Sequence, residues 1–191
     1  TWEVARGDLF GNMEVHDVAV AIGVDPHDRQ APDTVLDNLR YGKIIIMSDA
    51  DVDGAHIQTL FVTLFYTHFP KIVQAGRLYI ARPPLFAIKV ASQGKGRPER
   101  RLFALDADER DSMLAMLAKE GVKPDAIATS RFKGLGEMNP DQLKETTMQP
   151  ETRRLMQIVV TDDTFDETNR TLTLLMAKGE ASARRAWLER E

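Results

Sequence analysis

The most informative residues of the chain are three aspartates at alternate positions, Asp49, Asp51 and Asp53. Three negative charges so close together repel one another unless a cation or a cationic partner compensates them. Carboxylate oxygens are hard ligands, which favour Mg²⁺, Ca²⁺ or Mn²⁺ over Zn²⁺. The pattern therefore predicts a divalent-metal site of the kind that stabilises the attacking and leaving oxygens in phosphodiester chemistry.

Three alternative interpretations of the aspartates differ in how well the sequence supports them. An acidic turn that caps the following helix stays open, because aspartate suits both turns and N-caps. A calcium loop of the EF-hand type needs a glutamate at its twelfth position, where this chain has Leu60, so it is excluded. A phosphoaspartyl enzyme needs a hydroxyl residue where Asp53 stands, so it has little support.

The segments around the aspartates indicate what must position them. The apolar run at residues 44–47 predicts a strand covered on both faces of an α/β sheet, and such sheets bind ligands beyond the carboxyl ends of their strands. Apolar residues at helical spacing from Ile57 to Phe69 predict an amphipathic helix that begins near Ala55 and ends or kinks at Pro70. The positive end of this helix would offset part of the repulsion. His56 is a candidate phosphate contact, and equally a polar residue that faces water.

A second motif, Arg-Phe-Lys-Gly-Leu-Gly-Glu-Met-Asn-Pro, occupies residues 131–140. Gly134 and Gly136 permit a tight backbone beside the cations Arg131 and Lys133, and the final Asn-Pro pair favours a helix start. Taken alone, the segment is better explained as an ordinary glycine turn than as a phosphate-binding loop. Beside a carboxylate cluster, however, Lys133 is a candidate for neutralising phosphate charge at the same site.

Composition limits the class of protein. The chain has 191 residues, of which 43% are hydrophobic, enough for one domain with a core, or for one domain plus a helical appendage. It has no cysteine, hence no disulfide and no thiolate metal site, and no apolar stretch of about 18 residues that would span a membrane. The net charge of −4 argues against autonomous DNA binding. Residues 1–6 contain no signal-peptide core, so we expect a cytoplasmic protein, and the missing initiator Met suggests a piece of a longer chain.

The periodicity of the remaining sequence predicts further elements. Helices are predicted at residues 12–23, 33–39, 106–121, 152–155, 171–176 and 181–189, and strands or extended segments at 78–80, 85–90, 101–105 and 156–160. The polar, glycine-containing segment 92–100 predicts a loop between two paired strands. Strands alternating with helices indicate the α/β class.

The two motifs together resemble a known family. Residues 46–57, Ile-Met-Ser-Asp-Ala-Asp-Val-Asp-Gly-Ala-His-Ile, resemble the Asp-x-Asp segment of a TOPRIM domain, and residues 131–140 resemble a signature of bacterial type IIA topoisomerase B subunits. Residues 81–85, 145–147 and 152–154 are also similar to that family. Residues 1–4, 14–17 and 183–188 are more similar to its topoisomerase IV branch than to its gyrase branch.

The resemblance implies a fold and a set of site residues. The fold would be a Rossmann-like TOPRIM sheet with flanking helices at residues 1–125, followed by a mainly helical C-terminal tail region at 126–191. Asp49, Asp51 and Asp53 would be the catalytic, metal-binding aspartates. Lys133, with Arg131 and His56, would contact DNA close to the metal.

The resemblance also implies an activity. Such enzymes cleave both DNA strands by transesterification to a tyrosine of the A subunit, pass a second duplex through the break and reseal it, within a tetramer of two A and two B subunits. Mg²⁺ would be the cofactor, with Mn²⁺ or Ca²⁺ as substitutes in binding, and ATP would act only through an upstream module absent from this sequence. Tyr41, Tyr66 and Tyr79 would then be structural, and quinolone antibiotics would bind at the cleaved DNA.

Two features depart from the family pattern. No Glu-Gly-x-Ser-Ala sequence occurs, so the TOPRIM glutamate and its strand are expected to be missing and the isolated chain to be inactive. Arg82 stands before the proline pair, where an uncharged residue is expected. The alternatives that stay open are a gyrase B subunit, another TOPRIM protein such as a primase or nuclease, and a non-catalytic docking module.

Overall fold

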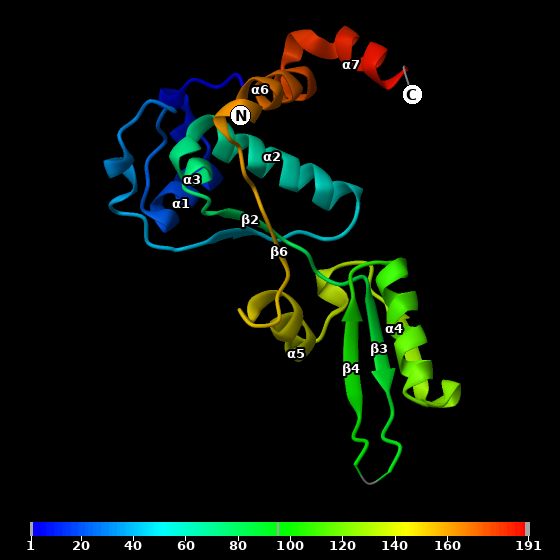
Figure 1. Ribbon diagram of the computed structural model, residues 1–191. Coiled ribbons are helices and arrows are strands. Elements are labelled where there is room, and N and C mark those ends of the chain that lie inside the picture. The colour runs from blue at the N-terminus through cyan, green and yellow to red at the C-terminus, as the bar shows by residue number, and fades with distance from the viewer. Residues whose placement is uncertain (1, 95, 190–191) are drawn as a thin grey trace. The chain divides into compact units, whose positions relative to one another are not determined.

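The computed structural model describes residues 2–94 and 96–189, which form two compact units (Figure 1). Unit 1 comprises residues 1–46, 57–80 and 157–191, and unit 2 comprises residues 47–56 and 81–156. The two units are therefore interleaved along the sequence. The predicted boundary between residues 125 and 126 stays a prediction. Among the described residues, no helix combines the length and apolarity that crossing a membrane requires.

Unit 1 is mostly helical. Its helices are the 3₁₀ turns Arg6–Gly11, Asp33–Leu36 and Lys178–Glu180, together with α1 (Met13–Ile22), most of α2 (Val52–His68), α3 (Pro70–Gln74), α6 (Asp162–Met176) and α7 (Ala181–Leu188). The Asn12 side chain accepts a hydrogen bond from the Val15 N–H at 3.0 Å and so caps α1, as predicted. Gly23 ends α1 in the left-handed conformation, with φ of 77°, which glycine adopts without steric cost.

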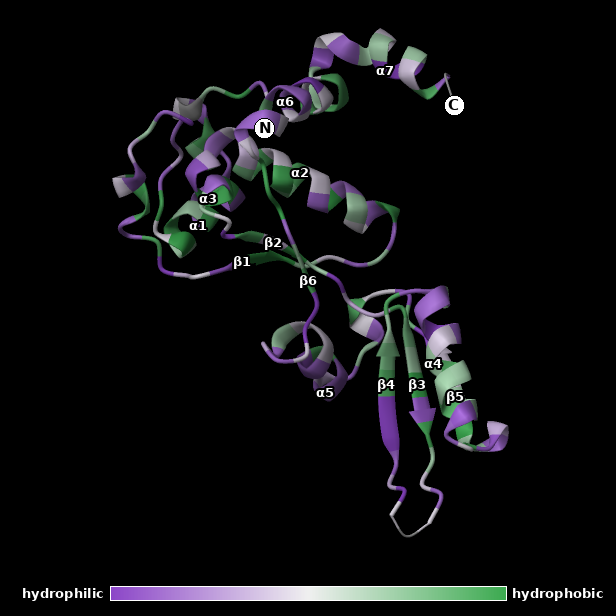
Figure 2. Ribbon diagram, in the orientation of Figure 1, coloured by the Kyte–Doolittle hydropathy of each residue, from purple (hydrophilic) through white to green (hydrophobic). Residues whose placement is uncertain are grey.

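A small sheet contains the strand that leads to the aspartates. Its order is β1 (Ile44–Ile46), β2 (Leu78–Ala81) and β6 (Leu155–Gln157), and β1 pairs in parallel with β2. Figure 2 colours β1 as hydrophobic. Ile46 is buried, but Ile44 and Ile45 are half-buried, and Met47 lies outside the strand with 36% of its surface exposed. The strand is thus shorter and less covered than its apolar run predicts.

The core of unit 1 forms where α1, α2 and α3 pack with β1 and β2. Its buried side chains include Val15, Ala19, Ile22, Ile46, Leu64, Phe65, Phe69, Ile72, Leu78 and Ile80. Of the apolar positions predicted for the α2 helix, Leu64, Phe65 and Phe69 are buried, Leu60 and Phe61 are half-buried, and Ile57 is exposed. Pro70 separates α2 from α3, as its effect on a helix predicts.

Unit 2 is built on an antiparallel sheet with the order β4 (Arg100–Ala104), β3 (Phe86–Val90) and β5 (Ile127–Arg131). Helix α4 (Ala107–Lys119) lies beside it (Figure 1), and Leu117 packs with Ile88, Val90 and Val122 in a small core. β5 is absent from the sequence prediction. Four of its five side chains are exposed, so it carries no alternating apolar signal.

The rest of unit 2 is a series of short helices. They are the 3₁₀ turns Pro124–Ala126 and Leu135–Glu137, α5 (Pro140–Leu143) and a π-helical turn, Lys144–Met148. Asn139 begins α5 with a reciprocal capping box to Gln142, as the Asn-Pro pair predicts.

Two predictions for the C-terminal third were wrong. Residues 152–154 are not helical, and Leu155 begins β6 instead of ending a helix. Helix α6 begins at Asp162, nine residues before the predicted start at Thr171. Its first half is rich in acidic and polar residues, which hide an apolar period, whereas the capping pair Thr161 and Thr164 fixes the true start.

Candidate metal and nucleic-acid site

Asp49 connects the two sequence motifs in the structure. It lies in the turn between β1 and α2, and its Oδ1 accepts a hydrogen bond from the backbone N–H of Leu135 at 2.7 Å. The two residues are 86 positions apart in the sequence, and both belong to unit 2. A charge-assisted bond of this kind fixes the direction of the carboxylate. The glycine-rich loop is therefore a direct support of the acidic turn.

Gly54 and Gly134 lie so close to Asp49 that a larger residue at either position would force neighbouring atoms to move. A Cβ on Gly54 would lie 2.0 Å from the carbonyl oxygen of Asp49, and a Cβ on Gly134 would lie 2.9 Å from its Cγ and Oδ1. Neither glycine has a left-handed backbone, so the requirement is space and not conformation. Gly54 and Gly134 are thus part of the site because the Asp49 backbone and side chain occupy the place of their missing side chains.

Asp51 caps helix α2. Its Oδ1 accepts a hydrogen bond from the Gly54 N–H at 2.7 Å, and its carbonyl oxygen accepts one from Ala55 at 3.0 Å. The helix consequently begins at Val52, three residues before the predicted start. The helix-capping interpretation of the acidic turn is therefore correct for Asp51. The cap does not exclude metal binding by Asp51, since it uses only one of the two carboxylate oxygens.

Asp53 lies in the first turn of α2 and is exposed, as are Asp49, Asp51 and the candidate phosphate contact His56. Within the described parts of the chain, no group of three or more His, Cys, Asp or Glu side chains is arranged to hold a metal ion. The donor chemistry nevertheless fits a hard cation, because the turn offers exposed carboxylate oxygens, and the bonds from Leu135 and Gly54 each use one oxygen of a carboxylate.

The predicted cationic residues lie around the glycine loop. Lys133 and Arg131 are exposed, whereas Phe132 between them is buried and donates its N–H to the carbonyl oxygen of Leu85 at 2.8 Å. The backbone N–H of Lys133 donates to Oε2 of Glu137 at 2.7 Å and so closes the loop. The loop is thus anchored by its apolar residue while its two cations remain available to solvent.

The sequence interpretation missed two members of this arrangement. One is the Leu135 N–H, a backbone donor that no side-chain pattern reveals. The other is Glu137, whose carboxylate accepts the Lys133 N–H and so fixes the loop. The two glycines on either side of Leu135 were the only signal, because a Gly-x-Gly pair indicates a backbone that approaches another group closely.

Two family models match the regions that form the site. The Toprim domain matches residues 14–83, which include the three aspartates. The carboxyl terminus of the DNA gyrase B subunit matches residues 124–189, which include the glycine loop. The α/β fold with a helical C-terminal region agrees with these matches.

Individual relatives match almost the whole chain. This chain is 44% identical over 191 residues to the DNA topoisomerase 4 B subunit of Haemophilus influenzae, and 49% identical over 189 residues to that of Pseudomonas aeruginosa. It is also 43% identical over 182 residues to the DNA gyrase B subunit of Thermotoga maritima. The matches cover 99%, 99% and 95% of this chain but only 28%, 28% and 26% of the relatives' lengths. The chain therefore belongs to the family of bacterial type IIA topoisomerase B subunits.

Proposed function

We propose that the chain is the TOPRIM and tail region of a topoisomerase IV B subunit and supports ATP-dependent cleavage, passage and religation of double-stranded DNA. The observation that carries this proposal is the hydrogen bond from Leu135 to Asp49, because it joins the acidic turn and the glycine loop into one site. Identity of 49% to the topoisomerase 4 B subunit of Pseudomonas aeruginosa, against 43% to the gyrase B subunit of Thermotoga maritima, supports the choice of this branch.

Asp49, Asp51 and Asp53 would hold Mg²⁺, and Mg²⁺ would supply positive charge at the scissile phosphate and the leaving 3′-oxygen. The chain's own groups prepare this site. The Leu135 N–H directs the Asp49 carboxylate, and the cap made by Asp51 fixes the turn. Since three exposed carboxylates repel one another, a cation would also stabilise the turn itself.

The cations Lys133 and Arg131, with His56, would contact the DNA phosphates. All three side chains are exposed, and Lys133 is two residues from the N–H that binds Asp49. The net charge of −4 argues that these contacts are too few for tight binding by the chain alone. We therefore propose that DNA binding depends on the A subunit, in a cytoplasmic tetramer of two A and two B subunits.

The nucleophilic tyrosine would come from the A subunit. Tyr66 is stacked between Trp2 and Phe165, and the Tyr79 hydroxyl lies 3.4 Å from the Nζ of Lys43, which supports a structural role for each. Tyr41 is 54% exposed and lies three residues before β1. ATP would act through a separate module of the complete subunit.

Asp51→Asn in the complete subunit, assembled with its A partner, tests the proposal. Asparagine caps a helix about as well as aspartate, so this substitution removes the charge and keeps the cap. We expect Mg²⁺-dependent DNA cleavage to be lost while the melting temperature is unchanged. Asp125→Asn, at an exposed position outside the site, is the matched control and should cleave normally. Normal cleavage by the Asp51 variant would refute the metal role.

A second candidate, a non-catalytic docking module, is favoured by the cap that Asp51 makes. A Mn²⁺ titration of the 191-residue chain followed by NMR separates the two, because bound Mn²⁺ broadens the signals of nearby residues. Broadening centred on residues 49–53 supports the metal site, and its absence there supports the module. To distinguish a gyrase B subunit from a topoisomerase IV B subunit, the decatenation and supercoiling activities of the assembled enzyme are compared. Supercoiling as the main activity would favour gyrase.

A further inference from the structure

Strand β4 forms one edge of the unit 2 sheet, since among the described residues it pairs only with β3. In an edge strand, the N–H and C=O groups of every second residue point away from the sheet. Within the described parts of the chain, residues 100–103 make no backbone hydrogen bond outside the ladder with β3. Arg100 and Arg101 are exposed, whereas Ala104 at the other end of the strand is buried. The first half of β4 is therefore an open edge, which can pair with one more strand.

A cavity of about 260 Å³ lies along this open edge. Residues 101–103 of β4 line it together with Arg82 and Arg154, and all its lining residues belong to unit 2. Three arginine side chains thus border the same space as the backbone of the edge. All three arginines are exposed, so a ligand in the cavity can reach them.

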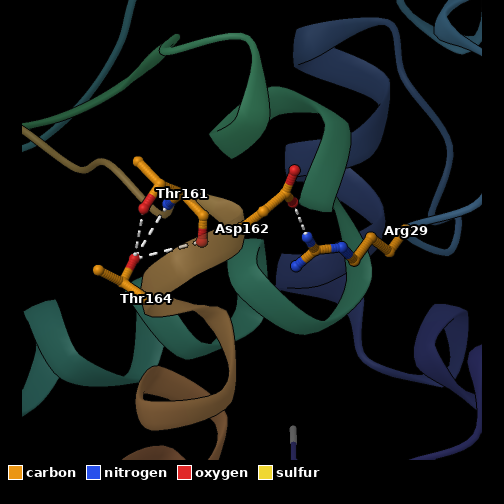
Figure 3. Close-up of polar contacts among 4 residues, drawn as sticks. All are labelled: Arg29, Thr161, Asp162 and Thr164. Carbon is orange, nitrogen blue, oxygen red and sulfur yellow. Dashed lines mark hydrogen bonds and ion pairs between the residues drawn. The ribbon is translucent and has the colours of Figure 1, made fainter.

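Arg82, whose charge departs from the family pattern, has no acidic partner. Its N–H donates to the carbonyl oxygen of Arg154 at 2.9 Å, so two cationic residues are neighbours. Arg154 pairs with Glu109 at 2.6 Å, just as Arg29 of unit 1 pairs with Asp162 (Figure 3). Arg82 forms no such pair with a described residue. Its guanidinium group is therefore available to bind a carboxylate.

Arg101 also lacks an acidic partner. It lies directly opposite Lys89 of β3, and like charges opposite each other on two strands are destabilising. Lys89 is compensated by Glu99, which lies 3.3 Å from its Nζ, whereas Arg101 forms no ion pair with a described residue. A carboxylate on a strand added beside β4 would lie next to Arg101 and reduce this repulsion.

The charges distinguish among three kinds of occupant. A second copy of β4 would bring two copies of Arg101 to one edge, and charged edge residues oppose such pairing. Nucleic acid would bring a continuous row of phosphates, but Glu145 also lines the cavity and Glu109 already neutralises Arg154. The excess of positive charge is therefore small, which favours a peptide with a few separate carboxylates.

We propose that β4 binds an extended, acidic peptide segment of a partner protein, which adds a strand along residues 100–103 and directs carboxylates toward Arg82 and Arg101. Backbone hydrogen bonds to the edge would supply affinity, and the two guanidinium groups would select acidic side chains. The site uses neither the acidic turn nor the glycine loop, so it does not depend on the proposed topoisomerase function.

An NMR titration of the 191-residue chain with the acetylated and amidated peptide Thr-Glu-Val-Glu-Val-Glu-Thr tests the proposal. We expect millimolar peptide to shift the amide signals of residues 100–103. β5 is the other edge of the same sheet, so the amides of residues 127–131 are the internal control and should shift much less. Absence of shifts in β4, or equal shifts in β5, would overturn the proposal.

Three further ligands separate backbone pairing from charge recognition. The peptide with Gln in place of every Glu should bind about threefold more weakly or worse. The acidic peptide N-methylated at its three central residues keeps its charges but cannot pair with the edge, so its shifts in β4 should be lost. A short DNA duplex should leave the β4 signals unchanged at the same concentration. Equal binding of either modified peptide, or larger β4 shifts with the duplex, would contradict strand addition by an acidic peptide.

Variants of the chain locate the acid-binding groups. Arg82→Gln and Arg101→Gln should each weaken binding of the acidic peptide about twofold to fivefold, the range for an exposed ion pair, and should leave the affinity for the Gln-containing peptide unchanged. Arg170→Gln, at an exposed position on α6, removes the same charge elsewhere and is the matched control. Unchanged affinity of both the Arg82 and Arg101 variants for the acidic peptide would refute the assignment of these residues.

Discussion

Gly134 stands so close to Asp49 that the carboxylate of Asp49 fills the space of a Gly134 side chain, with 2.9 Å between its Cγ and the position of a Cβ. The same carboxylate accepts the N–H of the next residue, Leu135. The hydrogen bond depends on the close approach, because the Asp49 carboxylate can reach the Leu135 N–H only if residue 134 has no side chain in its way. This dependence gives the first prediction.

Gly134→Ala should break the bond between Asp49 and Leu135. The added methyl meets the end of an exposed side chain, which can swing away, so we expect the fold to survive and the carboxylate to move. The Leu135 amide should lose its protection from hydrogen exchange, and Mg²⁺-dependent cleavage by the complete enzyme should fall about tenfold or more. Gly136→Ala, whose Cβ meets nothing within 4 Å, should leave the Leu135 amide protected. Retained protection in the Gly134 variant would contradict the prediction.

Gly54→Ala should destabilise the protein, in contrast to Gly134→Ala. Here the methyl would meet backbone, 2.0 Å from the carbonyl oxygen of Asp49, and backbone cannot rotate away. Overpacking of this kind costs about 1–3 kcal/mol. Urea unfolding of the variant beside Gly136→Ala measures the difference. Equal stability of the two variants would show that the turn between β1 and α2 adapts more freely than the structure indicates.

His27→Phe should destabilise unit 1 because it removes a buried hydrogen-bond acceptor. His27 is 7% exposed; its Nδ1 lies 2.8 Å from the carbonyl oxygen of Asp25, and its Nε2 accepts the N–H of Lys71 at 3.2 Å. Phenylalanine preserves the edge-on contact with Phe69 but leaves the Lys71 N–H without this acceptor. The expected loss is about 1–3 kcal/mol in thermal or urea unfolding. His16→Phe, at an exposed position on α1, should change stability by much less.

Glu109→Gln should reveal a stabilisation that depends on pH. A hydrogen bond from the Leu105 N–H at 2.6 Å, followed by the contact with Arg154, lowers the pKa of Glu109 below its ordinary 4.5. A lowered pKa in the folded state stabilises the protein at pH values above the ordinary pKa, and this contribution is lost as the pH falls through the folded-state pKa.

The wild-type protein should therefore be more stable than Glu109→Gln at pH 7, and the difference should disappear on acidification. Unfolding free energies measured from pH 7 to pH 3 check this. Glu151→Gln, at an exposed position, is the comparison variant. A difference that stays constant over the whole range would show that the ionised carboxylate contributes nothing.

The helical and strand elements with strong periodic or capping signals were predictable from the sequence. Asn12 and Gly23 mark the ends of α1, and Asn139 with Pro140 marks the start of α5. The elements that were missed depend on contacts with distant segments of the chain and not on a local sequence pattern. β5 has exposed side chains and owes its conformation to pairing with β3, which is a distant segment of the chain. No local pattern encodes such a pairing.

The same distinction applies to the candidate site. The residue types of Asp49, Asp51 and Asp53 indicate metal chemistry, and the resemblance indicates their family. The helix start at Val52 was predicted too late, because aspartate in the middle of a turn gives no sign of which of three residues is the cap. The support from Leu135 was not predictable at all, since a backbone N–H is common to every residue except proline.

The pairing of β5 with β3 limits where the chain can be shortened. A fragment that stops after residue 125 would lose β5, and β3 would then present an unpaired row of N–H and C=O groups along one side. Exposed strand edges of this kind recruit other chains. Pieces that stop there are therefore expected to aggregate, even when every residue of the acidic turn is retained.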